Sequence, residues 1–135
     1  MFSGKLQNMA TNEDQDCREI NKTLDEFFRC CVDENNNIDA ENVRLKFNLD
    51  LSRKNFNEDF GEVNFKNAVF EKSISFSKAT FSEDTNFMKA IFLGDTKFIE
   101  ATFSRKADFR NATFQYVNFG LATFSSKANF SNTSF

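Results

Sequence analysis

One stretch of oxygen-bearing side chains has the spacing of a cation-binding loop. Five such residues alternate with others in a calcium-loop frame: Asp33, Asn35, Asn37, Asp39 and Glu41. The frame fails where its geometry is strictest, because Ile38 stands at the glycine position and Arg44 in place of the bidentate glutamate. We therefore interpret the segment as a solvated loop that ends a helix, and we expect no bound metal or other cofactor.

The remaining reactive side chains do not form a catalytic pattern. The chain has no histidine, and it lacks a glycine-rich phosphate loop and a nucleophile motif. Its three cysteines are Cys17 and the adjacent pair Cys30 and Cys31, which have neither the spacing of a zinc site nor that of a disulfide framework. We expect all three to be reduced, with Cys17 and Cys31 on an apolar helix face, and we expect no enzymatic activity.

The first part of the chain predicts a helix and then a strand. Thr11 and Asp14 resemble a capping box, and apolar residues then recur at helical spacing up to the polar run that begins at Asp33. The residues of this stripe are Cys17, Ile20, Leu24, Phe27 and Cys31. From Val43 to Leu51 the period changes to two, which is typical of a half-buried strand.

Phenylalanine dominates the second part of the chain at intervals of five or six residues. It stands at positions 60, 65, 70, 76, 81, 87, 92, 98, 103, 109, 114, 119, 124, 130 and 135. A small residue usually lies two positions before each ring, as in ATFSED, TNFMK, ADFRN and ATFQY. A short fixed period with one large apolar residue per unit indicates a solenoid whose coils stack on one another.

These units resemble the pentapeptide repeat family over about residues 47–135. The resemblance implies an all-β solenoid, a right-handed quadrilateral β-helix in which each unit forms one side and its central residue points inward. We expect about four coils, with residues 1–46 forming an N-terminal α-helix and capping segment that covers the end of the stack. The expected core stack consists of Phe65, Phe70, Phe76, Phe81, Phe87, Phe92, Phe98, Phe103, Phe109, Phe114, Phe119, Phe124 and Phe130.

The uneven spacing independently favours a square coil. Nine intervals are five residues long and five are six residues long, and on a square coil the longer intervals fall at two opposite corners. Inserted residues then stack on inserted residues, so Phe60, Phe81, Phe103 and Phe124 form one column and Phe70, Phe92, Phe114 and Phe135 another. The interval from Phe114 to Phe119 lacks the insertion that the scheme requires. We expect a local irregularity there.

Two surfaces are candidates for binding a partner. Apolar residues fall at outward positions in one middle region, and this candidate patch consists of Val69, Met88, Ile91, Leu93 and Ile99. The alternatives are that the N-terminal helix packs on the patch, or that these residues simply favour strands. The second surface is the C-terminal end, where Phe135 occupies a core position and a homodimer could form.

Charge and hydropathy narrow the classes of function. Residues 1–59 carry 8 basic and 13 acidic residues, and residues 60–135 carry 9 and 7, which excludes a strongly basic nucleic-acid-binding surface. No apolar run approaches the ~18 residues of a membrane span, and the start lacks a signal-peptide pattern, so we expect a cytoplasmic protein.

The predicted function is that of a non-catalytic module or scaffold for an unidentified protein partner. The resemblance also permits an alternative, a DNA-mimicking protein that binds gyrase or topoisomerase, although the repeats lack an acidic stripe.

Overall fold

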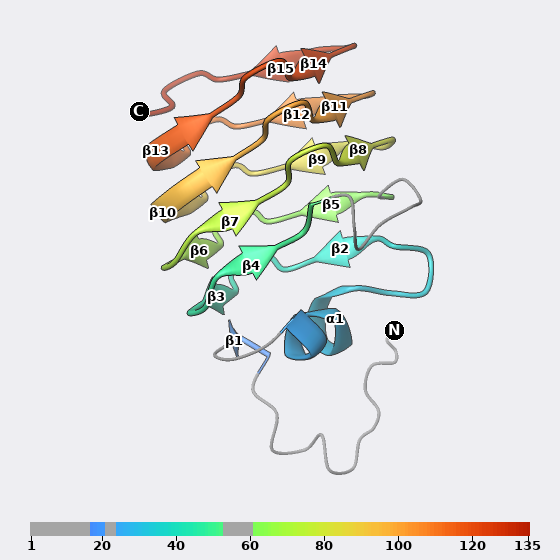
Figure 1. The fold of residues 1–135 in the computed structure, drawn as a ribbon, viewed down its shortest axis with the longest axis vertical. Coiled ribbons are helices and arrows are strands. Elements are labelled where there is room, and N and C mark those ends of the chain that lie inside the picture. The colour runs from blue at the N-terminus through green and yellow to red at the C-terminus, as the bar shows by residue number, and fades with distance from the viewer. Residues whose placement is uncertain (1–16, 21–23, 53–60) are drawn as a thin grey trace.

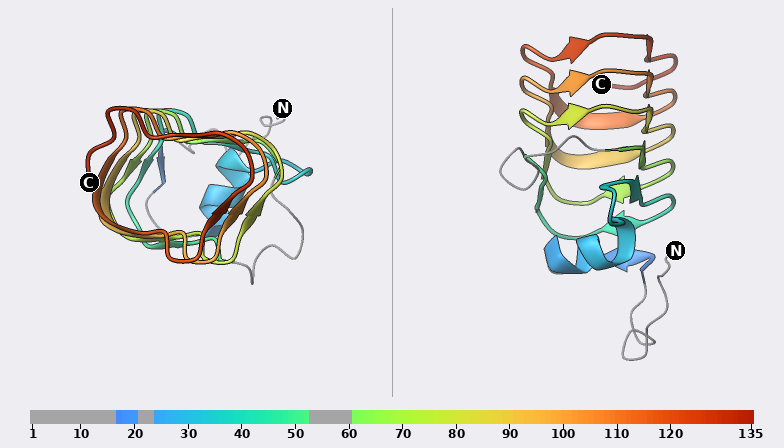
Figure 2. Two further views of the ribbon diagram at one scale, coloured as in Figure 1. Left: turned by 90° about the horizontal axis from the view of Figure 1, so that it is seen from above. Right: turned by 90° about the vertical axis from the view of Figure 1, so that its right-hand side faces the viewer.

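The computed structural model describes residues 17–20, 24–52 and 61–135, which form a rod of stacked coils with one short helix at its N-terminal end (Figure 1). Viewed along the rod, the coils superpose as a four-sided outline (Figure 2, left). The predicted four-sided β-solenoid is therefore confirmed. The solenoid has about five turns where about four were predicted.

Short parallel strands form the faces of the rod. One ladder consists of β2 (Ile38–Asp39), β5 (Val63–Asn64), β9 (Thr85–Asn86), β12 (Ala107–Asp108) and β15 (Ala128–Asn129). A second ladder consists of β8 (Thr80–Phe81), β11 (Thr102–Phe103) and β14 (Thr123–Phe124). The remaining strands are β1 (Glu19–Ile20), β3 (Arg44–Leu45), β4 (Leu49–Asp50), β6 (Val69–Phe70), β7 (Ile74–Ser75), β10 (Ile91–Lys97) and β13 (Thr113–Asn118). In this last group β10 and β13 are longer than the rest and run across a corner of the coil.

Phenylalanine rings fill the interior as four stacked columns. Successive rings in a column are nearly parallel, and their centroids lie between 4.5 and 5.7 Å apart. The columns are Phe65–Phe87–Phe109–Phe130, Phe70–Phe92–Phe114–Phe135, Phe76–Phe98–Phe119 and Phe81–Phe103–Phe124. These pairings confirm the predicted columns, except that Phe60 lies outside the described residues.

Burial of the predicted core stack decreases toward the C-terminal end. Its members from Phe65 to Phe114 are at most 2% exposed. Phe119, Phe124 and Phe130 are only partly buried and pack against that core. Rings from neighbouring columns meet in tilted or edge-on geometry, which aromatic quadrupoles favour over face-to-face contact.

Polar turns explain why asparagine or aspartate precedes many of the rings. The side-chain oxygen of Asn64 accepts a hydrogen bond from the Lys66 N–H, and the same two-residue pattern recurs along the rod. The repeated acceptors are Asn86, Asp108, Asn118 and Asn129. Next in the chain stands a residue with positive φ, such as Asn67 at 61°, and the Ala68 N–H then donates to the Phe65 carbonyl. The Asn or Asp side chain before a ring therefore stabilises the turn that follows that ring.

A β-bulge lies where the spacing predicts an irregularity. β10 pairs with β13 in register at Phe92 and Phe114, and the register then shifts before Asp95 pairs with Tyr116. The longer interval therefore places one extra residue on β10, opposite the shorter β13 segment. Gly94 lies in this bulge, and a Cβ atom added to it would be 2.6 Å from the Lys72 carbonyl carbon.

The N-terminal segment covers one end of the rod as predicted, although its secondary structure differs from the prediction. Helix α1 (Leu24–Cys31) places Phe27 on Phe65 with ring centroids 6.2 Å apart, and β1 pairs in parallel with β3. The prediction that Ile20 belongs to the helix is wrong, because Ile20 lies in β1 and is fully buried there. Thr11 and Asp14, the expected capping box, lie outside the described residues.

The prediction of three reduced cysteines is also wrong. Cys17 forms a disulfide with Cys30, and only Cys31 remains a buried thiol. The expectation failed because it placed Cys17 on a continuous helix. Cys17 instead lies two residues before the start of β1, where its Cα atom is 5.5 Å from that of Cys30.

An additional coil precedes the repeats, with smaller residues in place of phenylalanine at three of its inward positions. Ala40, Leu45 and Leu51 continue the inward columns and are at most 1% exposed. The single strand predicted over 43–51 is therefore wrong, since β3 and β4 are two strands on different faces separated by a bend at Phe47. Parallel pairing thus extends to the N-terminal side of residue 47. The division into residues 1–46 and 47–135 stays a prediction.

Substituting Gly94 by alanine should destabilise the solenoid. The added methyl group meets the Lys72 carbonyl and the Ser73 nitrogen, which are backbone atoms that a side-chain rotation cannot move away. We expect a loss of about 1–3 kcal/mol in the free energy of unfolding, measured by urea denaturation. Gly120→Ala is the control, because its Cβ atom approaches only the Asn118 side chain. Equal losses in both variants would contradict this account of the bulge.

Substituting Thr96 by valine should stabilise the protein. The Thr96 side chain is 2% exposed, and its Oγ1 has no hydrogen-bond partner among the described residues. It aligns with the apolar Ile74 and Leu49, so removing the hydroxyl should raise the free energy of unfolding by about 1–3 kcal/mol. Thr85→Val is the control, because Thr85 Oγ1 donates to the Glu83 carbonyl. A gain in the control as large as that in Thr96→Val would show that the unpaired hydroxyl is not the cause.

Candidate interaction surface

The segment with calcium-loop spacing uses its oxygen atoms to hold the backbone. The Asp33 carboxylate accepts hydrogen bonds from the Asn35 N–H at 2.8 Å and the Asn37 N–H at 3.0 Å. Partial burial opposes ionisation of Asp33, but these hydrogen bonds together outweigh it and lower the pKa of its carboxyl group. Asn37 Oδ1 in turn accepts from the Glu62 N–H in the next coil. The loop therefore ties α1 to β5, and the described residues contain no cluster of three metal-ligating side chains.

The candidate patch separates into an exposed centre and partly covered margins. Ile91 and Leu93 on β10 are 38% and 49% exposed, and Val69 lies directly beside Ile91 in the parallel ladder. Met88 and Ile99 are half-buried in the turns before and after β10. The ladder register thus brings Val69 and Ile91 together, whereas Met88 and Ile99 occupy corners on either side of them.

Helix α1 does not cover the apolar residues at the centre of the candidate patch. Phe27 of the helix stacks on Phe65 at the end of the rod, and β10 is separated from β1 in the ladder by β3 and β6. Ile91 and Leu93 retain their exposure with the helix in place. Of the sequence-based alternatives, cover by the helix is wrong, while a simple preference of these residues for strands is not tested.

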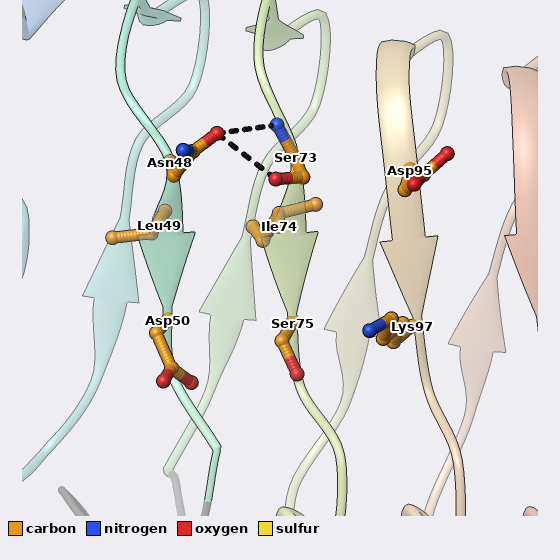
Figure 3. Close-up of a pocket in the computed structure, with 8 residues that line it drawn as sticks. All are labelled: Asn48, Leu49, Asp50, Ser73, Ile74, Ser75, Asp95 and Lys97. Atoms are coloured by element: carbon orange, nitrogen blue, oxygen red, sulfur yellow. Dashed lines mark hydrogen bonds between the residues drawn. The ribbon is translucent and has the colours of Figure 1, made fainter.

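A shallow groove continues the exposed row of β10. It has a volume of about 220 Å³ and crosses β4, β7 and β10 (Figure 3). Two rows of polar side chains border it: Asn48, Ser73 and Asp95 on one side, and Asp50, Ser75 and Lys97 on the other. Asn48 Oδ1 accepts hydrogen bonds from Ser73 N and Oγ, which fixes one border. This groove was not predicted from the sequence. The six-residue intervals, which align between neighbouring coils, could have indicated that polar residues form rows there.

Four outward residues of β10 together define what we call the β10 surface. They are Ile91, Leu93, Asp95 and Lys97, all of them exposed. The first two are apolar and the last two carry opposite charges beside the groove. A surface of this kind combines an apolar centre with a polar border, which is the composition of many protein interfaces and is not a catalytic arrangement.

The C-terminal end of the described rod exposes further apolar surface. Phe135 is 72% exposed although its ring stacks on Phe114, and Tyr116 and Leu121 are 65% and 81% exposed. Leu121 also has a φ of 59°, a backbone conformation that a branched apolar residue rarely adopts. This end therefore differs from the opposite one, where α1 covers Phe65.

Charged side chains on the rod are locally compensated. Arg110 forms hydrogen bonds with both carboxylate oxygens of Asp108, and Arg105 lies 3.7 Å from Glu83 in the coil below. The Arg110 side chain lowers the pKa of the Asp108 carboxyl group, and Asp108 raises the pKa of Arg110. These pairs interrupt any acidic surface along this part of the rod.

The fold defines a β-solenoid repeat protein, and a comparison with family models identifies the family. A model of pentapeptide repeats (9 copies) matches residues 59–99 and 89–134. The chain therefore belongs to the pentapeptide repeat family, whose members are in general non-catalytic repeat proteins. No curated protein and no solved structure matches the chain. Among the described residues, no helix is long and apolar enough to cross a membrane.

The Asp108–Arg110 pair predicts a specific response to acid. The folded pKa of Asp108 is lowered, so the stability that it contributes is present above its unfolded pKa and is lost as the pH falls through the folded pKa. In Arg110→Ala we expect the pKa of Asp108 to rise toward its ordinary value, measured by an NMR pH titration of the carboxyl carbon. Asp33 is the internal control, because backbone and Asn37 hydrogen bonds lower its pKa. An unchanged Asp108 pKa would contradict the assigned cause.

Proposed function

We propose that the protein is a non-catalytic interaction module or scaffold that binds a protein partner through the β10 surface. The observation that carries this proposal is the exposure of Ile91 and Leu93 in the middle of a rod whose other outward positions are mostly polar. A partner that covers them would remove apolar area from water, and Asp95 and Lys97 would fix its orientation from the border of the groove.

The ladder supports binding by holding this surface in one conformation. β10 pairs with β6 and β7 on one side and with β13 on the other, so its backbone is held on both sides of the bulge at Leu93 and Gly94. The inward residues between the exposed ones include Phe92 and Thr96, which are at most 2% exposed. The β10 surface would therefore lose little conformational entropy when a partner binds.

A homodimer through the C-terminal end is a second proposal, supported by a separate observation. Residues 111–135 contain one charged residue, Lys127, whereas residues 89–110 contain eight. Depletion of charge around partly exposed rings is typical of an interface core, and two such ends would not repel each other strongly. Light scattering of the purified protein tests this proposal, and a monomer at high concentration would contradict it.

The DNA-mimicking alternative has weaker support. Such mimicry needs a continuous negative face, yet residues 60–135 carry 9 basic against 7 acidic residues, and Asp108 and Glu83 are paired with arginines. The cytoplasmic location likewise stays a prediction. The Cys17–Cys30 disulfide is an observation against it, because disulfides persist mainly in oxidising compartments.

An Ile91→Asp/Leu93→Asp variant should lose a partner that the wild-type protein captures. Two carboxylates in the apolar centre would have to be desolvated on binding, so we expect at least a tenfold lower recovery of that partner. The measurement is quantitative affinity capture from lysate of the source cells, followed by mass spectrometry, after circular dichroism has shown that each variant is folded.

The matched control carries the same charges at the same spacing on another face. Thr102→Asp/Ser104→Asp changes outward positions next to β11, in a different ladder from β10. The proposal requires that this control retain the partner. Identical captured proteins for all three chains would contradict binding through the β10 surface, and recovery of a topoisomerase subunit would favour the alternative.

A further inference from the structure

We propose that the Cys17–Cys30 disulfide is a redox-controlled latch on the N-terminal cap, so that its reduction by a dithiol releases β1 and α1 from the end of the solenoid. The disulfide joins the residue that leads into β1 to the penultimate residue of α1. These two elements are the ones that cover the end of the rod (Figures 1 and 2). The proposal is independent of the β10 surface.

Backbone pairing and buried side chains hold the capping elements to the rod. The backbone hydrogen bonds between β1 and the β3 segment include those from Arg44 N to Arg18 O at 2.8 Å and from Lys46 N to Ile20 O at 2.7 Å. A salt bridge of 3.3 Å between Lys46 and Glu19 lies beside them, with both side chains partly exposed. An exposed pair of this kind contributes little to stability.

Helix α1 is anchored mainly through one of its faces. Phe27 is fully buried against Phe65, and Cys31 is 5% exposed. The helix has 8 residues, fewer than an isolated helix needs to persist in water. Leu24, Phe28 and Cys30 also pack against the core, so contacts with the rod and with β1 keep this short helix folded.

The covalent link adds a loop-closure contribution to the stability of the closed cap. The disulfide closes a loop with a sequence separation of 13, and the entropy of closing such a loop corresponds to on the order of a 100-fold change in an equilibrium constant. The disulfide lowers the conformational entropy of the open state, because β1 and α1 cannot move independently of each other in the oxidised chain. Reduction removes that restriction without changing any other contact in the closed cap.

Exposure makes the disulfide accessible to exchange. Cys17 is exposed and Cys30 is half-buried, so a thiolate of the dithiol can attack the Cys17 sulfur. A mixed disulfide forms at Cys17, and Cys30 leaves as a thiolate that takes up a proton. The second thiol of the reagent then attacks the reagent's sulfur in the mixed disulfide, which frees Cys17 as a thiol. Two electrons and two protons pass to the protein, and the reagent becomes a cyclic disulfide.

Release of the cap would uncover two features that the closed structure conceals. The face of the Phe65 ring against Phe27 would be open to solvent or to a partner. The edge of β3 that pairs with β1 would present unpaired backbone groups, which can accept another strand. The reduced protein would therefore have an additional docking edge that the oxidised protein lacks.

Cys31 provides a direct readout, because this last residue of α1 is buried in the closed structure and is not part of the disulfide. We would measure the rate of its alkylation by iodoacetamide in oxidised wild-type protein and in a Cys17→Ser/Cys30→Ser variant, in which it is the remaining thiol. Reaction on the order of 100-fold faster in the variant is expected, from the loop-closure contribution. Equal rates in the two proteins would overturn the proposal.

Hydrogen exchange separates opening of the cap from unfolding of the rod. In wild-type protein treated with dithiothreitol, the amides of Arg44 and Lys46 should lose protection, whereas the Phe87 amide, which donates to Asp108 O at 2.7 Å, should retain it. This measurement does not depend on whether the double variant folds. Retained protection at Arg44 and Lys46 after complete reduction, or equal loss at Phe87, would overturn a latch that acts on the cap alone.

Discussion

Ring-on-ring stacking of phenylalanine between coils is the constraint on which the other features of the rod depend. Parallel strands in neighbouring coils lie at nearly the separation that stacked aromatic rings prefer, and the centroids in the columns are 4.5 to 5.7 Å apart. A shift of one residue in any coil would turn a ring outward and break both the stack and the ladder. One residue type at one position per unit therefore sets burial and register together.

The corners satisfy this constraint by absorbing differences in the length of the units. Where a unit has six residues in successive coils, the extra residues lie opposite one another, as the pairing of Ile74 with Thr96 shows. Where one coil lacks the extra residue, β10 bulges at Gly94 while Phe92 remains stacked on Phe114. The core is thus conserved in geometry while the outward residues vary, and β10 is where that variation exposes Ile91 and Leu93.

The two ends of the described rod differ in how their rings and strand edges are covered. A stack of coils leaves an apolar bore and unpaired strand edges at each end. At the N-terminal end, Phe27 covers the bore and β1 covers the edge of β3, joined by a disulfide. At the C-terminal end of the described rod, the rings of Phe119, Phe124 and Phe130 are only partly buried, and Lys127 is the one charged residue in the sequence from 111 to 135. The first arrangement is the basis of the proposed redox latch, and the second is the basis of the proposed homodimer.

The periodic phenylalanines by themselves determined the square coil, the columns of rings and the site of the bulge, because a repeat converts spacing directly into position in space. They did not determine the coil that contains Ala40, Leu45 and Leu51, since smaller residues replace phenylalanine there and the alternation from Val43 to Leu51 indicated a single strand. Only the tertiary structure decided that Ile20 lies in a strand beside β3 and that Cys17 meets Cys30. Those placements depend on contacts with the end of the stack, which a local pattern cannot report. The groove between β4, β7 and β10 likewise exists only once three coils are stacked in register.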